Sequence, residues 1–166
     1  MNLLLRRARP QDFALIGALT TTAYVVDDLI APDAAYLGFL ADVATRDRDG
    51  EVWVATDEAG IILGAVTFVA PGSTLCEIAR GREAEMRCLA VDPSARGAGV
   101  GESLTGLVVD RAREEECDAI VLCSSTRMAA AHRLYARLGF QRLPERDWSP
   151  NSSVDLLAYT LPLSPP

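Results

Sequence analysis

Two spacings of apolar residues divide this chain into predicted helices and strands. Apolar residues recur every three or four positions in four segments, which begin after Pro10, after Asp33, at Val100 and at Arg127. This spacing is typical of helices that bury one face. Short apolar runs between these segments, alternating or continuous, indicate strands. The seven expected strands are Leu3–Ala8, Glu51–Thr56, Ile61–Val69, Ala84–Val91, Ala119–Cys123, Phe140–Arg142 and Val154–Leu161.

Four helices are expected among these strands, each with a recognisable beginning or end. The first starts at Pro10 and Asp12 and ends before a loop over Val25–Asp28, and Asp33 caps the second, whose apolar stripe is Tyr36, Phe39, Leu40 and Val43. The third runs from Val100 to near Glu116, and the fourth covers Arg127–Leu138 and stops at Gly139. The order βααβββαβαββ predicts an α/β (α+β) fold, in which a mixed central sheet of about seven strands has about four helices on both faces.

Length, charge and cysteine content limit the function classes. The chain of 166 residues is long enough for one domain with a full core, residues 1–166. A net charge of −7 without a Lys/Arg-rich block argues against nucleic acid as a partner. The longest apolar run, Ile61–Ala70, is too short to cross a membrane, so no membrane partner is expected. Four cysteines without Cys-x-x-Cys spacing and a single histidine predict a cytoplasmic protein with free thiols and no metal site.

A glycine-rich hexapeptide, Arg96–Gly101, follows the strand that Asp92-Pro93 ends, and it opens the third helix. A strand that enters a helix through such a turn gathers backbone N–H groups and the positive end of the helix dipole around one point. Arg96 adds a cation with a planar set of donors. The Gly-x-Gly-x-Gly spacing differs from the dinucleotide fingerprint, and no Gly-Lys-Ser/Thr follows. A flexible turn is the simple alternative, but the strand, the arginine and the helix together favour a phosphate site.

Two segments resemble the GNAT superfamily of N-acetyltransferases, namely Glu85–Pro93 running into Arg96–Gly101, and Ala131–Phe140. The order of elements fits that superfamily over almost the whole chain, and Pro144–Trp148 is similar to members of unassigned substrate. The resemblance implies a mostly antiparallel, GNAT-like sheet. It also implies transfer of an acetyl group from acetyl-CoA, a cosubstrate, to a primary amine of a small molecule or a peptide. The amine would attack directly in a ternary complex, and a homodimer stays open.

The resemblance further implies where the cosubstrate binds. The glycine-rich turn would hold the pyrophosphate. The strand before it would pair through its backbone with the pantetheine arm, which enters a gap beside the strand that matches Ile120–Ser124. Family members often carry Asn where this chain has Met128, so one polar contact near the cofactor is not expected. The cofactor-binding residues implied are Leu89, Ala90, Val91, Arg96, Gly97, Ala98, Gly99, Val100, Gly101, Glu102, Ser124, Ala131 and Leu134.

Acetyl transfer to an amine needs a base that takes a proton from the ammonium and an acid that protonates the leaving thiolate. Tyr135 matches the family's tyrosine and is expected as the acid, with a core tyrosine as the alternative. Glu85 is expected as the base, directly or through water, because strict alternation places it on the strand face of Leu89 and Val91. Glu83 is the reserve, and a salt-bridged carboxylate is the alternative for Glu85. The backbone N–H of Leu89 is the expected oxyanion donor.

Two other functions fit parts of the same sequence. A non-catalytic acyl-CoA-binding sensor would keep the phosphate turn without turnover, and the presence of both Tyr135 and Glu85 argues against it. A Cys- or Ser-dependent hydrolase would have to use His132 as its base, and the sequence has no Gly-x-Ser-x-Gly elbow. Further candidates for lining the acceptor site are Asp27, Asp28, Trp148 and the loop Pro71–Glu83.

Overall fold

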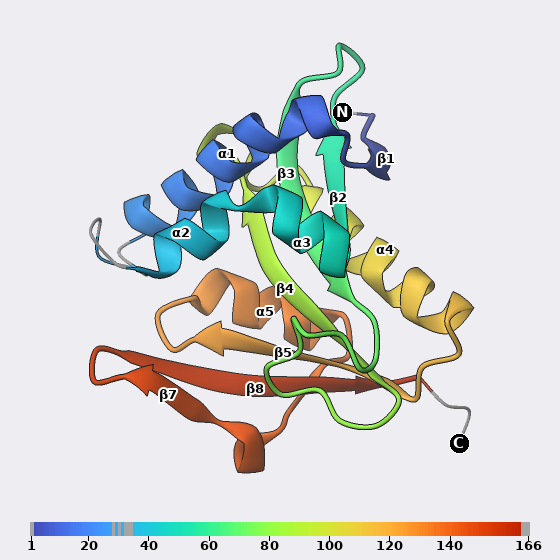
Figure 1. The fold of residues 1–166 in the computed structure, drawn as a ribbon, viewed down its shortest axis with the longest axis vertical. Helices are drawn as coiled ribbons and strands as arrows, with labels where there is room; N and C mark the ends of the chain where they lie inside the picture. Colours follow the sequence, from blue (N-terminus) through green and yellow to red (C-terminus); the bar gives the residue numbers. More distant parts are fainter. Residues whose placement is uncertain (1, 28, 30, 32–34, 164–166) are drawn as a thin grey trace.

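The computed structural model describes residues 2–27, 29, 31 and 35–163 (Figure 1). These residues form eight β-strands and five α-helices. The strands are β1 (Leu4–Arg7), β2 (Glu51–Thr56), β3 (Ile62–Val69), β4 (Glu83–Val91), β5 (Ala119–Ser125), β6 (Gln141–Arg142), β7 (Trp148–Asn151) and β8 (Val154–Pro162). The helices are α1 (Phe13–Val26), α2 (Tyr36–Ala41), α3 (Val43–Asp49), α4 (Val100–Glu114) and α5 (Ala129–Arg137).

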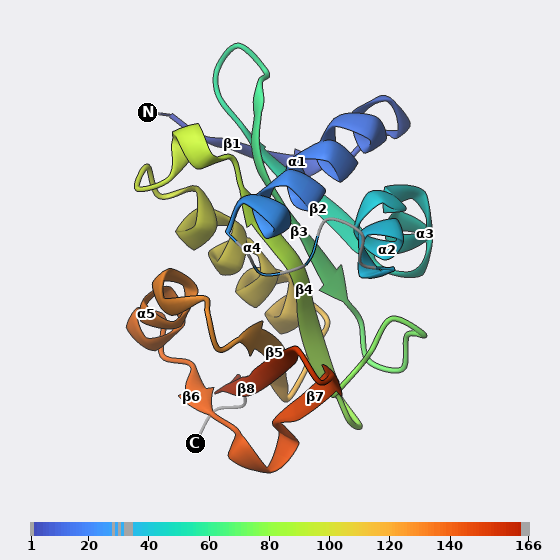
Figure 2. The ribbon, with the colours of Figure 1, turned by 90° about the vertical axis from the view of Figure 1, so that its left-hand side faces the viewer.

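The eight described strands form one sheet, in the order β1-β2-β3-β4-β5-β8-β6, with β7 paired to β8. Each pairing is antiparallel except that of β4 with β5. Figure 2 shows α1, α2 and α3 on one side of β4 and α4 on the other. The structure therefore confirms the predicted mixed, mostly antiparallel sheet with helices on both faces.

Each face of the sheet has its own apolar core. Leu104 and Val108 of α4 pack against a cluster that includes Phe68 of β3. On the opposite face, Ile16 of α1 packs in a second cluster with Val54 of β2. Full burial of such a side chain stabilises the fold by roughly 1.5–3 kcal/mol. The two clusters therefore fix α1 and α4 against the strands that carry the site described below.

The region between α1 and β2 differs from the prediction. Helix α1 continues through Val26, so the expected loop over 25–28 is wrong at its first two residues. No helix-breaking residue precedes Asp27, and the helix therefore extends to that point.

The second predicted helix is two helices. Asp42 leaves the helical backbone (φ −81°, ψ 71°), and its side chain accepts a hydrogen bond from the Thr45 N–H at 3.1 Å. Asp42 therefore begins α3 as an N-cap. The predictions for Asp28 and Asp33 lie outside the described residues.

Strand β7 is an addition to the seven predicted strands. Its four residues are all exposed and include Pro150, so no apolar alternation announces it. Trp148 and Asn151 pair with Leu156 and Val154 of β8. Proline is tolerated there because β7 is an edge strand whose outer side needs no partner.

The sheet opens between β4 and β5. The two strands pair at three positions only, where Glu83–Glu85 lie beside Ala119–Val121. β4 continues to Val91 and β5 to Ser125, but no described strand pairs with this edge of β4 beyond Glu85. A row of backbone donors and acceptors therefore faces the gap, as at the edge of a sheet. We call this gap the β4–β5 opening.

A β-bulge lies in β4 at the same level as the opening. Thr67 of β3 pairs with Arg87 and Ala65 pairs with Ala90, so β4 has one residue more than β3 between the two pairs. Cys88, within this interval, has φ +53°. Such an extra residue interrupts the ladder and shifts the alternation of side chains.

The bulge corrects one prediction. Before it, Met86 faces the α4 core, and after it Leu89 packs against the same core. Arg87 lies on the other face, where its guanidinium stacks on the Phe39 ring of α2 at 4.6 Å. Glu85 shares that face with Arg87. The expectation that Glu85 and Leu89 point the same way is therefore wrong, because strict alternation does not hold across Cys88.

Candidate active site

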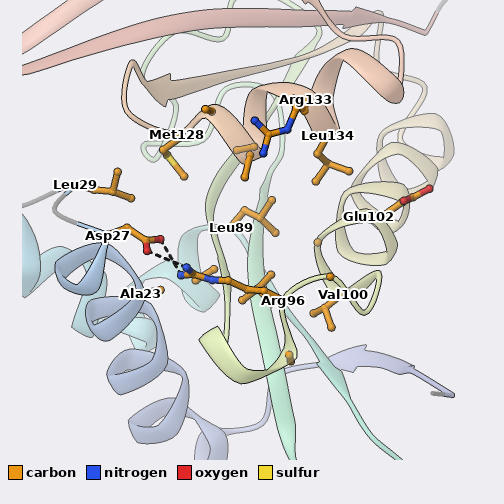
Figure 3. Close-up of a pocket in the computed structure, with 18 of the residues that line it drawn as sticks. Ala23, Asp27, Leu29, Leu89, Arg96, Val100, Glu102, Met128, Arg133 and Leu134 are labelled. Atoms are coloured by element: carbon orange, nitrogen blue, oxygen red, sulfur yellow. Dashed lines mark hydrogen bonds and ion pairs between the residues drawn. The ribbon is translucent and has the colours of Figure 1, made fainter.

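A pocket of about 750 Å³ lies beside the β4–β5 opening (Figure 3). Its walls come from the end of α1, the last residues of β4, the turn that opens α4, and α5 with the residues before it. Figure 3 shows Leu89 between Arg96 on one side and Leu134 of α5 on the other. The volume falls in the range of small-molecule sites. We call it the arginine pocket, after the four arginines that line it.

The turn before α4 forms one end of the arginine pocket. Gly97 and Gly99 have φ of +79° and +82°, a backbone region that favours glycine. A side-chain carbon at either position would meet nothing within 4 Å, so the turn borders open space. The hydrogen bonds of α4 begin with the Ser103 N–H, which donates to the Gly99 carbonyl at 2.9 Å. The amides before Ser103 therefore lack a helical acceptor, and with the helix dipole they are suited to hold an anion.

Positive charge dominates the lining of the arginine pocket. Among the residues that the structure describes, the lining has four arginines (Arg96, Arg127, Arg133 and Arg137) and two carboxylates (Asp27 and Glu102). Arg96 pairs with Asp27 at 2.8 Å, and Arg137 pairs with Glu102 at 2.7 Å. Arg133 forms no ion pair or hydrogen bond within the described part of the chain. A chain with a net charge of −7 thus gathers cations around one cavity, which suits a polyanionic ligand.

The arginines of this pocket beyond Arg96 were not predicted from the sequence. Arg133 and Arg137 are four residues apart in α5, so they lie on one side of the helix. This spacing of two arginines, close to a glycine-rich turn that suits a phosphate, is the feature of the sequence from which they could have been predicted. Tyr24 of α1 also lines the pocket and was missed, because nothing in the sequence shows that the end of α1 meets β4.

Most of the cofactor-binding residues expected from the sequence line the arginine pocket. They are Leu89, Ala90, Val91, Arg96, Gly97, Gly99, Val100, Gly101, Glu102, Ala131 and Leu134. Ala98 and Ser124 do not belong to this lining. Ser124 is 2% exposed, and its hydroxyl lies 3.1 Å from His132 Nε2. His132 is half-buried, but the Ser124 hydroxyl is buried beside it, so Ser124 offers no accessible nucleophile to a substrate, as the hydrolase alternative would require.

Tyr135 lies in the core beneath α5. It is 3% exposed, and its ring contacts those of Phe140 and Tyr159 at centroid distances of 5.7 and 5.8 Å. Burial raises the pKa of its phenol, so the hydroxyl stays protonated at neutral pH. That hydroxyl has no hydrogen-bond partner among the described residues. Burial raises the pKa of Tyr24 in the pocket wall, and the nearby Tyr135 is among the groups that raise it further.

Glu85 and Glu83 are both bound within the protein. Glu85 is 1% exposed, and its Oε2 accepts the backbone N–H groups of Glu77, Ile78 and Ala79 at 2.9, 3.0 and 3.0 Å. Glu83 accepts two hydrogen bonds from Arg146, at 2.5 and 3.2 Å. The two carboxylates therefore fasten the loop before β4 to the sheet.

The open parallel pair and the anion-binding turn are the features of an acyl-CoA-dependent acyltransferase, which the two sequence segments implied. The family model described as "Acetyltransferase (GNAT) family" matches residues 13–140. The chain belongs to this family of acetyltransferases, which use acetyl-CoA.

Relatives and solved structures agree with this placement. The chain is 32% identical over 113 residues to mycothiol acetyltransferase of Cellulomonas flavigena, a match that covers 63% of this chain and 32% of that protein. It is 32% identical over 76 residues to N-alpha-acetyltransferase 30 of Saccharomyces cerevisiae, covering 43% of each chain. The chain thus spans less than half the length of these curated relatives.

The fold is similar to solved structures over their whole length. One is an acetyltransferase of the GNAT family from Staphylococcus aureus Mu50, with a TM-score of 0.79, 16% identity and coverage of 98% of this chain and 100% of that one. Another is yncA of Salmonella typhimurium with its cofactor acetyl-CoA, with a TM-score of 0.70, 22% identity and coverage of 99% and 96%. At these identities the likeness shows the fold.

The residues present fit an acyl-CoA thioester. The glycine turn and Arg96 can hold a diphosphate, and Arg133 offers a further cation for a phosphate. The open edge of β4 can pair with an extended amide-containing arm in the way that a sheet accepts another strand. Among the described residues, no three or more His, Cys, Asp or Glu side chains are grouped to hold a metal ion. None of the described helices is both long and apolar enough to span a membrane.

Proposed function

We propose that the protein is an N-acetyltransferase that moves an acetyl group from acetyl-CoA to a primary amine by direct attack within a ternary complex. The observation that carries this proposal is the β4–β5 opening beside the arginine pocket. An extended thioester whose phosphates lie at the glycine turn would pass along the edge of β4 into this opening. Family membership and the anion site support the same cosubstrate. A cytoplasmic location and a homodimer stay predictions.

The chain supplies the groups that such a transfer needs. We propose Tyr135 as the acid that protonates the leaving thiolate, since its buried phenol is neutral and its hydroxyl has no partner in the described structure. The β4 bulge interrupts pairing with β3 next to Leu89. A backbone N–H released there is suited to stabilise the oxyanion of the tetrahedral intermediate.

Glu85 is poorly suited to the role of base. It lies across the sheet from Leu89, and its Oε2 already accepts three backbone hydrogen bonds. A proton on that oxygen would disrupt those bonds, and each buried donor left without a partner costs about 1–3 kcal/mol. We therefore propose that Glu85 positions the loop before β4 and that another group receives the proton of the amine.

Binding of coenzyme A tests the pocket assignment. We expect Gly99→Glu to weaken binding, measured by calorimetry, at least about tenfold, because it adds bulk and negative charge to the anion site. Gly60→Glu is the matched control. Gly60 has φ +84°, likewise borders open space, and lies in the β2–β3 turn away from the pocket. Equal affinity of both variants would overturn the assignment of the glycine turn.

Turnover separates the proposed enzyme from an acyl-CoA sensor. Release of free coenzyme A is followed with polyamines, aminoglycosides, amino acids and peptides as acceptors, with product identity checked by mass spectrometry. We expect acetylation of at least one class. Binding of acetyl-CoA without transfer to any of them would favour the non-catalytic sensor.

A further inference from the structure

A second groove of about 420 Å³ lies between the loop segment 77–80 and the segment 145–148. Its walls are fastened together by Arg146, which bonds to Glu83 and donates to the Ile78 carbonyl at 3.1 Å. The Glu85 carboxylate accepts three hydrogen bonds from backbone N–H groups of the same loop segment and so fixes its position. These hydrogen bonds of Arg146 and Glu85 therefore fix the shape of the second groove.

The second groove meets the β4–β5 opening from both strands. On the β4 side, Glu77 pairs with Arg87 at 2.6 Å, two residues beyond the last paired position, Glu85. On the β5 side, Cys123 lies two residues beyond Val121 and near enough to Trp148 for that side chain to act on the pKa of the thiol. Burial raises the pKa of the Cys123 thiol to about 11, against the opposing effect of Trp148.

The arginine pocket lies at the end of β4, beside residues 89–91 and the end of α1, whereas the second groove lies toward the start of β4, where Arg146 binds Glu83. Leu89 lines the arginine pocket and packs toward α4. Arg87, which holds Glu77, lies on the other face beside Phe39. A thioester reaching through the opening from the arginine pocket would thus present its acetyl group toward the second groove.

Arg87 fixes the position of the Glu77 carboxylate. Its guanidinium also donates to the Leu75 carbonyl at 2.9 Å and to the Tyr36 hydroxyl at 3.1 Å. The Arg87 side chain is 9% exposed, whereas that of Glu77 is 28% exposed. The pair is thus anchored at the arginine and open to the groove at the carboxylate. Burial raises the pKa of Glu77, against the opposing effect of Arg87, which makes it a stronger base than an ordinary glutamate.

We infer that the second groove binds the acceptor, that Glu77 receives its ammonium group and takes its proton, and that Trp148 packs against its hydrocarbon part. This inference rests on the proposed function and names the substrate class, a small primary alkyl amine that arrives as a cation. Trp148 is 38% exposed, and an aromatic face beside a carboxylate attracts an alkylammonium ion. The other charges of the groove are Arg146 and Asp147, paired with Glu83 and Arg142, and Glu145 and Arg80.

The protons balance with these groups. The ammonium carries three protons, and one passes to Glu77, which frees the nitrogen lone pair. The C–N bond forms as the nitrogen attacks the thioester carbonyl, and the C–S bond breaks as the intermediate collapses. Tyr135 gives its phenol proton to the leaving sulfur and regains one from the second proton of the nitrogen, and Glu77 releases its proton to water after the product leaves. The third stays on the amide product.

Three variants test the inference by steady-state kinetics with acetyl-CoA and an amine that the wild-type enzyme acetylates. Glu77→Gln keeps the size of the side chain but removes the base, and we expect kcat to fall about 10²-fold. Glu77→Asp keeps the charge that pairs with Arg87 but withdraws the carboxylate, and we expect a fall of at least about tenfold. Glu58→Gln removes an equal charge from the exposed β2–β3 turn, outside the lining of both sites, and is expected to stay within about twofold of wild type. All three should bind coenzyme A with wild-type affinity.

The outcomes separate this inference from the proposed function. Wild-type kcat in Glu77→Gln, or equal losses in Glu77→Gln and Glu58→Gln, would overturn the role of Glu77 and leave the transferase intact. Full activity in Glu77→Asp together with loss in Glu77→Gln would make Glu77 only the structural partner of Arg87, which also overturns the inference. A wild-type protein that binds acetyl-CoA but acetylates no amine would overturn the proposed function, and the acceptor groove with it.

Discussion

The ion pair between Arg96 and Asp27 spans the mouth of the arginine pocket and competes with a phosphate ligand. Arg96 donates from both terminal nitrogens to both oxygens of Asp27, at 2.9 and 2.8 Å (Figure 3). This forked arrangement is the one that a guanidinium also offers to phosphate. Coenzyme A would therefore have to displace the Asp27 carboxylate before its diphosphate could bind Arg96. Removal of that carboxylate by Asp27→Asn should strengthen coenzyme A binding.

The size of the effect follows from the exposure of the pair. The Arg96 and Asp27 side chains are 43% and 37% exposed, so solvent screens their attraction. Exposed ion pairs are typically worth about 0.2–1 kcal/mol, and two hydrogen bonds place this pair near the upper value. Since 1.4 kcal/mol is a factor of ten, we expect the dissociation constant of coenzyme A to fall about two- to fivefold. The gain should shrink as salt rises, because screening weakens the competing pair.

Isothermal titration calorimetry at two salt concentrations measures this change, with Asp110→Asn as the control. Asp110 is an exposed α4 carboxylate that pairs with Arg113 outside the arginine pocket, so it changes net charge equally. Weaker binding by Asp27→Asn would show that Asp27 orients Arg96 for the ligand instead of competing with it. An equal gain in both variants would show an effect of net charge alone.

Three further predictions concern the same site. Arg133→Ala should weaken coenzyme A binding about tenfold by calorimetry, while Arg113→Ala should not. Tyr135→Phe should lower kcat about 10²-fold with unchanged coenzyme A affinity, whereas Tyr159→Phe, its ring neighbour, should stay near wild type; equal rates would remove Tyr135 as the acid. Glu85→Gln should lower the free energy of unfolding by about 2 kcal/mol and expose the loop before β4 to proteases; a stable, inactive variant would instead return Glu85 to the base role.

Much of the fold could be predicted because local pattern decides it. The glycine-rich turn predicted the end of β4 and the start of α4, since a strand followed by glycines and an apolar helix leaves few arrangements. Predictions of helices and strands failed where the local sequence carries no signal for them. The break at Asp42 depends on a side chain that caps the next helix, and β7 depends on pairing with β8 rather than on its own residues.

The residues of the candidate site also divide into those that the sequence predicts and those that only the structure places. The sequence placed Arg96, Gly99 and Leu134 near one ligand, and the structure brings them to one pocket. It put Glu85 on the face of Leu89, because nothing in the residue types marks Cys88 as the bulge. Arg133 lay within a recognised motif, but only the structure shows that it has no ion-pair partner among the described residues.

The sequence by itself determined most of the order of helices and strands, the glycine-rich turn before α4 and the membership in the acetyltransferase family. These features arise from residues adjacent in the chain, whose spacing sets backbone geometry and the buried face. Tertiary structure alone decided which carboxylates are free for chemistry. Glu83 and Glu85 are bound by Arg146 and by loop amides, whereas Glu77 reaches a groove because Arg87 holds it there. The availability of a charged group depends on the partners that packing brings to it, and those partners lie far away in the sequence.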